Sequence, residues 1–295
     1  MKIGTTEIED SFAEAFEMRY ARLLVTAIDD YWCDTAISEF TGFGTSIIAC
    51  DVEAARERRL SPTETPDGRP GASVLIFGFS TDVLAKSIPR RAGQCLLTCP
   101  TTAVFDGLEK SQKRVALGSY LRYFGDGFQR SKVIARKRYW RLPVLDGEFL
   151  VEESIGVEKG VAGGCLLIQA TNLHDGLRAA REAVTSLAEM PGVILPFPGG
   201  VVRSGSKVGS RYDGLRASTN DALCPTLRGR VATELHPATT HAYELVIDGV
   251  DEATVAAAMA TAARAAASQG VVAIGAPNYG GKLGKYHFHL HEILR

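Results

Sequence analysis

Apolar and polar positions along the chain repeat one arrangement four times: an apolar run, an amphipathic helix, a glycine-containing turn and a second apolar run. In the third repeat Leu177, Ala180 and Val184 recur at the spacing of one helix face, after Asp175 in the first turn. We expect the following elements, each given as strand, helix and strand: 21–29, 30–40 and 45–51; 72–79, 80–92 and 94–100; 164–171, 174–190 and 192–198; and 241–249, 251–268 and 270–277.

These units predict the fold class. Strand-helix-strand units form right-handed crossovers, and two of them build a ferredoxin-like lobe. The chain therefore predicts an α+β protein of two ferredoxin-like (split βαβ, βαββαβ) lobes, residues 1–160 and 161–295. A hairpin-rich insertion is expected over 118–155, where Gly125-Asp126-Gly127 and Asp146-Gly147 give turn signals. A single doubly wound sheet is the weaker alternative, because no strand is followed by the GxGxxG of a dinucleotide fold.

Composition and charge argue against several classes of partner. The 295 residues are 45% hydrophobic and 23% charged, and a formal net charge of −1 gives no global attraction to nucleic acid or membrane. No apolar run approaches the roughly 18 residues of a membrane span, and the N-terminal segment lacks the apolar region of a signal peptide. The 6 cysteines form no CxxC pair, which favours reduced thiols and a cytoplasmic location.

Residues 196–226 form a long segment that cannot bury a core of its own. The segment is poor in aliphatic residues and rich in Gly, Ser, Thr, Asn and charged side chains. Glycines let a backbone approach another molecule closely, and loops of this length inside a domain are usually functional or disordered. Apolar or rigid residues, Pro196-Phe197-Pro198 and Cys224-Pro225, hold both ends. The segment indicates a binding surface, with a structural connection as the alternative.

Acidic residues stand at unusual places in the chain. Glu244 lies inside the apolar strand AYELVIDG, where desolvation would raise the pKa of its carboxyl and let it donate a proton at neutral pH. An exposed position in the strand alternation is the competing interpretation for Glu244. Asp67 and Asp126 lie in glycine-rich segments and are interpreted mainly as turn formers.

Residues 130–141 contain six basic side chains interleaved with two aromatic ones. Three interpretations stay open: a solvated hairpin face, a dock for an anionic ligand tail or an acidic partner subunit, and a nucleic-acid stripe. Because the chain as a whole is not basic, we expect no nucleic-acid binding. Arg136, Lys137 and Arg138 are the residues expected at an anionic tail or partner.

Two further patterns resemble known sites without matching them. Lys282 in GAPNYGGKLG lacks the flanking residues of a phosphate loop, so a glycine-rich turn before the last strand is the better interpretation. His287, His289 and His291 alternate on an expected strand and share one face, as zinc ligands do. No acidic residue follows them at the spacing of a water activator. We expect no metal site.

Segments spread over the chain carry a resemblance to one family. They are EIEDSFAEAFE (7–17), TGFGTS (41–46), ETPDGRPG (64–71), FGDGFQ (124–129), VAGG (161–164), PFPGGVV (196–202), SKVGS (206–210), ASTNDALCPT (217–226) and GGKLGKYHFHLH (280–291). Several are long and unusual in composition. The chain resembles the formylmethanofuran–tetrahydromethanopterin formyltransferases over nearly its whole length. The resemblance implies two ferredoxin-like lobes, homodimers or homotetramers, and a cleft at lobe and subunit boundaries.

The resemblance also implies an acyltransferase of one-carbon metabolism. The family moves a formyl group between the amine of methanofuran and N5 of tetrahydromethanopterin. The near-neutral charge and the basic stretches 56–59 and 130–141 are similar to the version in methylotrophic bacteria, a subunit of a formyltransferase/hydrolase complex in formaldehyde oxidation. That version implies flux from formyl-pterin toward formyl-methanofuran. Residues 227–240 depart from the archaeal pattern of the family.

By this resemblance the transfer needs no metal and no tightly bound cofactor, with tetrahydromethanopterin and methanofuran as substrates. A tetrahedral oxyanion forms without a covalent enzyme intermediate, and the protein must orient both substrates and stabilise the oxyanion. Glu244 is the implied protonated carboxyl near the formyl group. The implied substrate-binding residues are the donors Ser206, Lys207, Ser218, Thr219 and Asn220 and, on the pterin side, Phe124 and Asp126.

Two other functions stay open from the sequence. One is a non-catalytic scaffold subunit of the formyltransferase/hydrolase complex, against which the polar segment 196–226 argues. The other is a formyltransferase or deformylase that uses folate. The sequence leaves open the direction of flux and the exact pterin and furan analogue.

Overall fold

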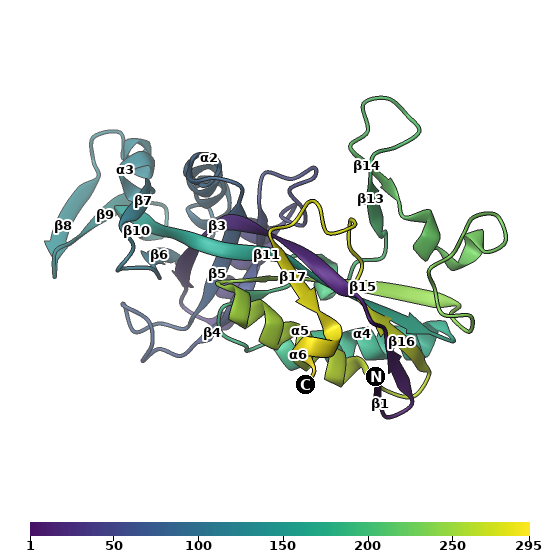
Figure 1. Ribbon diagram of the computed structural model, residues 1–295. Helices are drawn as coiled ribbons and strands as arrows, with labels where there is room; N and C mark the ends of the chain where they lie inside the picture. Colours follow the sequence, from purple (N-terminus) through teal and green to yellow (C-terminus); the bar gives the residue numbers. More distant parts are fainter. The chain divides into compact units, whose positions relative to one another are not determined.

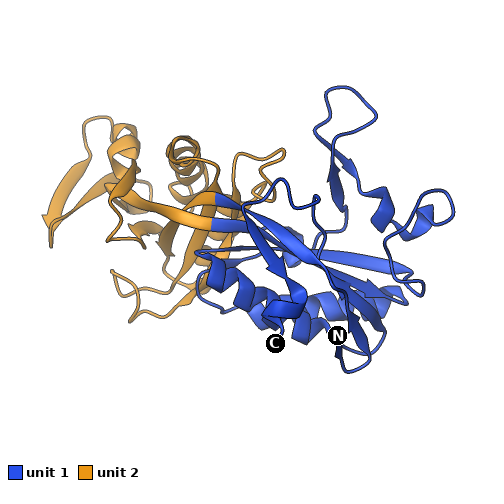
Figure 2. Ribbon diagram, in the orientation of Figure 1, with its two compact units in different colours: residues 1–17, 161–295 blue, residues 18–160 orange.

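The computed structural model describes residues 1–295, which form two compact units (Figures 1 and 2). Unit 1 comprises residues 1–17 and 161–295, and unit 2 comprises residues 18–160. Helices accompany mostly antiparallel strands in both, so the α+β class is confirmed. The two units meet in the chain between residues 160 and 161, and the first 17 residues, expected in the N-terminal lobe, group with unit 1. There they pair with β16 (Val271–Gly275) and β17 (Tyr286–His289).

Unit 2 contains two strand-helix-strand repeats, whose first strands and helices lie where expected and whose second strands lie later in the chain than expected. Its elements are β3 (Phe12–Thr26, from residue 18), α1 (Asp30–Thr41), β4 (Glu53–Leu60), β5 (Gly71–Gly78), α2 (Thr81–Arg91) and β6 (Ala103–Asp106). The antiparallel pairings give the strand order β4-β5-β3-β6. All eight residues of β5 are buried, because strands flank it on both sides and α1 and α2 pack against it.

Two expected strands of unit 2 are wrong. Residues 45–51 form a turn, because the Ser46 carbonyl accepts hydrogen bonds from the Ala49 and Cys50 N–H groups at 3.1 and 2.8 Å. Residues 94–96 instead belong to the π-helix η1 (Ala92–Leu96), which continues α2 and is closed by Leu97 N–H bonded to the Ala92 carbonyl, and residues 97–100 form a turn. A short apolar run fits a buried helix face as well as a strand, so periodicity alone cannot separate them.

The remainder of unit 2 contains the expected hairpin insertion. Its elements are β7 (Lys113–Ala116), α3 (Gly118–Leu121), η2 (Arg122–Gly125), β8 (Arg130–Ile134), β9 (Lys137–Val144), β10 (Gly147–Glu152) and the first part of β11 (Ser154–Ala170). The β9–β10 turn falls at the predicted Asp146-Gly147 signal. The β8–β9 turn places Ala135 and Arg136 in the left-handed region, at φ 48° and 67°, which residues other than glycine rarely adopt.

Unit 1 contains the third and fourth repeats. Its repeat elements are β11 from residue 161, α4 (Leu173–Leu187), β12 (Val193–Ile194), β15 (His241–Gly249), α5 (Glu252–Ala266) and β16. Antiparallel pairings give the strand order β12-β15-β11-β16. Shorter elements complete it: β1 (Lys2–Ile3), β2 (Thr6–Ile8), η3 (Pro198–Gly200), β13 (Ser206–Val208), β14 (Ala217–Thr219), η4 (Asp221–Leu223), η5 (Pro225–Leu227), β17 and α6 (Leu290–Ile293).

The sheet of unit 1 has two different faces. Helices α4 and α5 cover one face, and their small buried residues pack on Leu166, Ile168 and Leu245. Loops, among them the one that carries β13 and β14, lie on the other face (Figure 1). Asn172 and Asp251 begin the two helices by accepting hydrogen bonds from Asp175 N–H and Thr254 N–H. The helix-covered face therefore forms the core, and the other face is free for a site.

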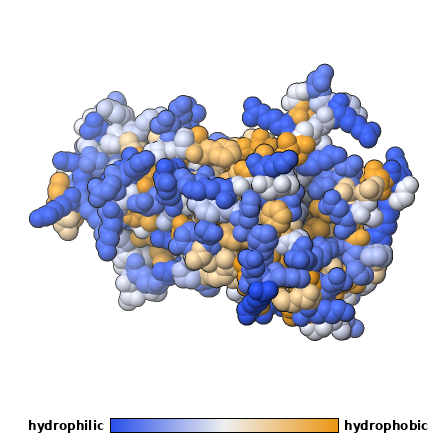
Figure 3. All heavy atoms as spheres, in the orientation of Figure 1, coloured by the Kyte–Doolittle hydropathy of each residue, from blue (hydrophilic) through white to orange (hydrophobic).

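No helix is both long and apolar enough to cross a bilayer. The face drawn in Figure 3 is mainly hydrophilic, with apolar residues in small groups.

Helix α5 packs so closely on Gly164 of β11 that there is no room for a side chain at this position. A Cβ there would meet Val255 Cγ1 at 2.5 Å and Met259 Sδ at 3.1 Å. We expect Gly164→Ala to lower the free energy of unfolding by about 1–3 kcal/mol, because the extra methyl overpacks the core. Urea denaturation measures it. The double variant Gly164→Ala/Val255→Ala should lose less free energy of unfolding than the two single variants lose together. Additive losses would contradict this packing account.

Candidate active site

Glu244 lies in the middle of β15 and points away from the helices. Its neighbours Tyr243 and Leu245 belong to the core with α4 and α5, so strand alternation puts the Glu244 side chain on the loop-covered face. The β11–β15 register sets Leu167 directly opposite Glu244, and Leu167 is buried. The expected exposed position in the alternation is therefore wrong, because loops cover this face and leave Glu244 half-buried.

Burial raises the pKa of Glu244 to about 7, and a hydrogen bond with the Cys165 side chain lowers it by a smaller amount. Removing a carboxylate from water disfavours its charged form, which is why the shift is upward. At neutral pH the carboxyl is therefore present in both protonation states. Such a group can donate a hydrogen bond or a proton to a reacting atom.

Segment 196–226 reaches Glu244 through a backbone bridge. Val202 N–H donates to the Glu244 carbonyl at 2.7 Å, and Glu244 N–H donates to the Val202 carbonyl at 3.1 Å. Four residues further on, Ser206 begins the β13–β14 hairpin and hydrogen-bonds the Tyr279 side chain. The segment predicted as a binding surface thus begins at the candidate acid.

Tyr279 comes from a second loop, and the Cys165 and Glu244 side chains act electrostatically on its phenol. Burial raises the pKa of its phenol to about 12, with further upward contributions from the nearby Cys165 and Glu244 side chains, while the hydrogen bond with Ser206 lowers it. The phenol therefore stays protonated across the physiological range and remains a hydrogen-bond donor. Glu244, Cys165, Ser206 and Tyr279 together form the polar cluster of this face.

Glu14 on β3 fixes the loop that carries Tyr279. Its carboxylate accepts N–H groups from the turn 279–284, with Gly281 at 3.0 Å, Leu283 at 2.9 Å and Gly284 at 3.1 Å, and with Tyr279 as the fourth donor. The residue is 2% exposed. Burial raises the pKa of Glu14, but the four donated hydrogen bonds outweigh it and hold the pKa below its usual value.

The other expected donors of segment 196–226 are only partly brought to this cluster. Lys207 and Ser218 pair with each other across the hairpin, on the face opposite to Ser206 and Thr219. Lys207 forms an ion pair with Asp221, and the Ser218 hydroxyl donates to the Gly209 carbonyl at 2.8 Å. Thr219 is exposed. Asn220 is half-buried, and its carbonyl accepts from the Leu223 N–H.

Phe124 and Asp126 lie in unit 2, two positions apart in the chain. Phe124 is 65% exposed and lines a groove of about 1380 Å³ together with Tyr120, Tyr123 and Leu145. Asp126 ends η2 in the left-handed conformation, so the interpretation of this residue as a turn former is confirmed. The groove offers aromatic faces to an apolar or planar ligand.

Two of the three expected basic contacts already have acidic partners inside unit 2. Lys137 pairs with Glu109, and Arg138 lies 3.5 Å from Glu153. Arg136, at the tip of the β8–β9 hairpin, is exposed and forms no ion pair. A solvated, internally paired hairpin face therefore accounts for two of them.

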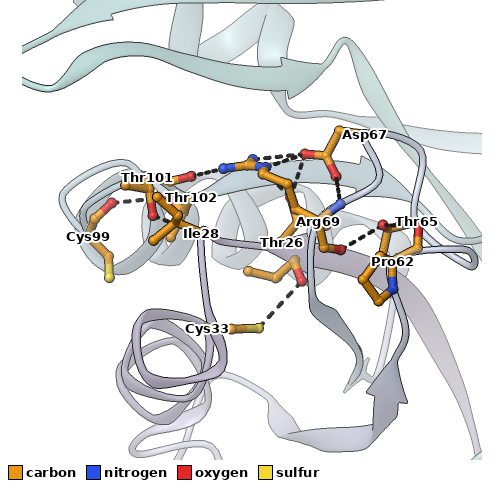
Figure 4. Close-up of polar contacts among 11 residues, drawn as sticks. Thr26, Ile28, Cys33, Pro62, Thr65, Asp67, Arg69, Cys99, Thr101 and Thr102 are labelled. Atoms are coloured by element: carbon orange, nitrogen blue, oxygen red, sulfur yellow. Dashed lines mark hydrogen bonds and ion pairs between the residues drawn. The ribbon is translucent and has the colours of Figure 1, made fainter.

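Asp67 belongs to a structural clasp, which Figure 4 shows. Its carboxylate accepts hydrogen bonds from Thr26 Oγ1 at 2.8 Å and Arg69 Nε at 2.9 Å. Arg69 also donates to the Thr101 carbonyl and to Thr26 Oγ1. The interpretation of Asp67 as a turn former is therefore confirmed, because its oxygens hold the turn 61–70 against β3.

The histidines and Lys282 take structural positions in unit 1. His287 and His289 contact the ring of Phe12, with centroids 5.3 and 5.0 Å apart. His291 lies in α6 and bonds the Ile8 carbonyl through Nε2 at 2.8 Å. No three His, Cys, Asp or Glu side chains gather as metal ligands do. Lys282 lies in the expected turn before the last strand.

Sequence reasoning missed Glu14, Cys165 and Tyr279. The signal for Glu14 was weak but present: a carboxylate inside the apolar strand FAEAF, and a glycine-rich turn, NYGGKLG, whose N–H groups need acceptors. Cys165 resembled an ordinary buried thiol. Nothing in the sequence indicates that Tyr279 meets segment 196–226, because the contact joins residues far apart in the chain.

An α+β fold with a half-buried carboxyl of raised pKa near hydroxyl donors fits an enzyme that transfers an uncharged group through an oxyanion. Comparison with known proteins identifies which one. Residues 1–144 match the family model described as formylmethanofuran-tetrahydromethanopterin formyltransferase, and residues 147–293 match that of the FTR proximal lobe. The chain belongs to this family and is a formyltransferase.

Individual relatives cover the full length. The chain is 52% identical over 301 residues to the formylmethanofuran–tetrahydromethanopterin formyltransferase of Methylobacillus flagellatus, with 100% of both chains covered. The corresponding structure from Methanosarcina barkeri superposes with a TM-score of 0.95 at 46% identity, covering 99% of this chain and 100% of that one. The formyltransferase/hydrolase complex from Methylorubrum extorquens with methylofuran contains a chain at TM-score 0.96 and 46% identity, covering 100% and 99%.

The raised pKa of Glu244 has a consequence for stability. The folded chain binds this proton more tightly than the unfolded chain, whose pKa is near 4.5, so stability falls as pH rises from about 4.5 to about 7. The loss above pH 7 is about 3 kcal/mol. We expect Glu244→Gln to remove this loss and to exceed the wild type in urea stability at pH 8. The exposed Glu189→Gln should keep the wild-type profile. If the urea stabilities of the wild type and Glu244→Gln changed with pH in the same way, the raised pKa of Glu244 would be contradicted.

Proposed function

We propose that formyl transfer takes place at the Glu244 carboxyl, between N5 of tetrahydromethanopterin and the amine of methanofuran or a methanofuran analogue. The observation that supports it most is a half-buried carboxyl with a pKa of about 7, next to hydroxyl groups on an open sheet face. A carboxylic acid at neutral pH suits an oxyanion, because it can donate where a carboxylate would repel.

The proposed reaction is a direct exchange between two nitrogens. The acceptor amine attacks the formyl carbon, and the carbonyl oxygen becomes the oxyanion of a tetrahedral intermediate. The bond to the donor nitrogen then breaks, that nitrogen takes up one proton, and the acceptor nitrogen releases one, so no net proton is consumed. Protonated Glu244 donates to the oxyanion and passes its proton toward the leaving amine. No residue of the enzyme becomes formylated.

Ser206 is the proposed hydroxyl donor closest to this chemistry, because it bonds Tyr279 beside Glu244. Lys207, Ser218, Thr219 and Asn220 remain proposed contacts for the substrate farther from the formyl group. Phe124 is proposed to contact the planar pterin, for which its exposed ring and groove are suited. Asp126 is proposed to bind polar pterin atoms next to it.

The partners are proposed from the relatives. A relative of known structure is part of the formyltransferase/hydrolase complex of Methylorubrum extorquens, crystallised with methylofuran. This chain is proposed to act in the same kind of complex, in the cytoplasm of an organism that oxidises formaldehyde, with flux toward formyl-methanofuran and as a homodimer or homotetramer. No tightly bound cofactor is proposed.

Each unit is also proposed to be a ferredoxin-like lobe. The support is that both units combine two strand-helix-strand repeats with equivalent strand orders, β4-β5-β3-β6 and β12-β15-β11-β16. In each case the first strand of the first repeat lies between the two strands of the second repeat.

The scaffold alternative can be separated from catalysis with one assay. The purified chain alone is mixed with formyl-tetrahydromethanopterin and methanofuran, and formyl exchange is followed. Turnover by the isolated chain supports the enzyme. If only the assembled complex turned over, and Glu244→Gln left its rate unchanged, the chain would be a scaffold. Formyl-tetrahydrofolate as donor tests the folate alternative in the same assay.

Glu244→Gln tests the acid. The amide keeps the shape and a donor but cannot transfer a proton, so we expect kcat to fall by roughly 10²- to 10⁴-fold with KM little changed. The wild-type kcat should also fall as pH rises through about 7, because the carboxyl then ionises. Steady-state kinetics from pH 5.5 to 9 measure both effects.

The control for this variant is Glu189→Gln, which makes the same change at an exposed residue just after α4. It should match the wild type in kcat and pH profile. A wild-type kcat for Glu244→Gln would exclude proton transfer by this residue.

The basic hairpin is proposed to contact an anionic ligand tail or an acidic partner subunit through Arg136 in particular. Lys137 and Arg138 would contribute to its field, although each already faces a carboxylate. We expect Arg136→Ser to raise KM for the substrate with the anionic tail, or to weaken complex assembly, more strongly at low salt. The comparison variant Arg130→Ser removes a charge at the other end of β8. Equal effects of the two variants would favour a general field over a specific contact.

A further inference from the structure

Two loops that are distant in sequence meet through Ser206 and Tyr279, and only one of them is bridged to the strand that carries Glu244. Segment 196–226 is fixed by the backbone bridge between Val202 and Glu244. The turn 279–284 has no such bridge to β15. Its four inward N–H groups all end on the carboxylate of Glu14.

From this arrangement, and resting on the proposed function, we propose that Glu14 is a positioning residue: it fixes the turn 279–284 so that the Tyr279 hydroxyl stands beside Glu244 as a second hydrogen-bond donor to the oxyanion. Tyr279 is 38% exposed, so its ring contributes little to the core.

The geometry around Glu14 divides the turn between the two carboxylate oxygens. Oε2 accepts from Tyr279 and Gly281, and Oε1 accepts from Leu283 and Gly284. The turn needs glycine at its far end, because a Cβ on Gly284 would meet the backbone N and O of Ala15 at 2.8 Å. The turn therefore lies directly on β3, and the Oε2 half of the carboxylate holds the end that carries Tyr279.

A glutamine at position 14 would disturb only half of this arrangement. Its single carbonyl oxygen can accept from one pair of N–H groups, while its NH₂ group faces the other pair donor to donor. The backbone hydrogen bonds of one pair are lost whichever way the amide turns. A charged acceptor also binds N–H groups about twice as strongly as a neutral one, so the remaining pair is weakened too.

The test compares Glu14→Gln, Tyr279→Phe and the double variant in the full-length protein. We expect kcat to fall about 10²-fold in Tyr279→Phe, as for loss of one oxyanion donor, with KM little changed. Glu14→Gln should lose about as much through misplacement of Tyr279. Since both act through one hydroxyl, the double variant should be no slower than the slower single variant. Multiplied losses would overturn the proposal.

A second readout separates positioning from general destabilisation. Hydrogen exchange of the amides at 279–284 should become faster in Glu14→Gln and stay slow in Tyr279→Phe. Unchanged protection of these amides in Glu14→Gln would also overturn the proposal. The matched control is Glu17→Gln on the same strand, whose carboxylate pairs with the exposed Lys285 at 2.7 Å and accepts none of the N–H groups of the turn that bond Glu14. It should keep the wild-type kcat and exchange.

The outcome for this proposal is distinct from the outcome for the proposed function. If the wild type exchanged no formyl group, or if Glu244→Gln were as fast as the wild type, the proposed function would fail. If Glu244→Gln were slow while Glu14→Gln and Tyr279→Phe both kept the wild-type kcat, the acid would stand and only the positioning role would fall.

Discussion

The packing of α4 and α5 on one face of β15 and β11 is the constraint on which the site depends. Leu245, Leu166 and Ile168 must face these helices to stay out of water. A slip of one residue in the strand register would exchange the two faces, which makes the register strongly specified. Glu244 is thereby forced onto the opposite face, whatever its own preference for water. Apolar burial on one side of a strand thus places an acid on the other.

Two glutamates of unit 1, Glu14 and Glu244, show how the surroundings of a carboxyl decide its charge. Glu14 receives four backbone N–H groups, and its pKa is lowered despite burial. Glu244 has the Cys165 side chain as its hydrogen-bond partner, and burial raises its pKa to about 7. A carboxylate that organises a turn needs many donors, whereas an acid that serves an oxyanion must have few. The Glu14 carboxylate holds the turn 279–284, and the Glu244 carboxyl remains available to a substrate.

Much of the fold follows from the sequence, because local rules determine it. Helices α4 and α5 begin at capping residues and repeat apolar positions at helical spacing, and β15 is an apolar strand with Glu244 visibly out of place. The strand expected at 94–100 was wrong since Leu96 and Leu97 suit a π-helical continuation of α2 equally well. The site was predictable only where one segment carries the signal, as in 196–226. The meeting of Glu14, Tyr279 and Ser206 depends on contacts across up to 270 residues of chain, and no local pattern encodes them.

The same two carboxyls give the fold opposite responses to pH. A lowered pKa means that Glu14 stabilises the fold above its unfolded pKa, and this stabilisation is lost as acid protonates it. A raised pKa means that the fold loses stability between about pH 4.5 and 7, where this carboxyl has ionised in the unfolded chain but keeps its proton in the folded one. Protonation of Glu14 at low pH therefore releases the turn that carries Tyr279, whereas Glu244 becomes charged at high pH. Oxyanion stabilisation is available at the pH values where Glu14 is ionised and Glu244 is protonated. The protonation of these two carboxyls therefore sets the pH dependence of both the reaction and the stability of the fold.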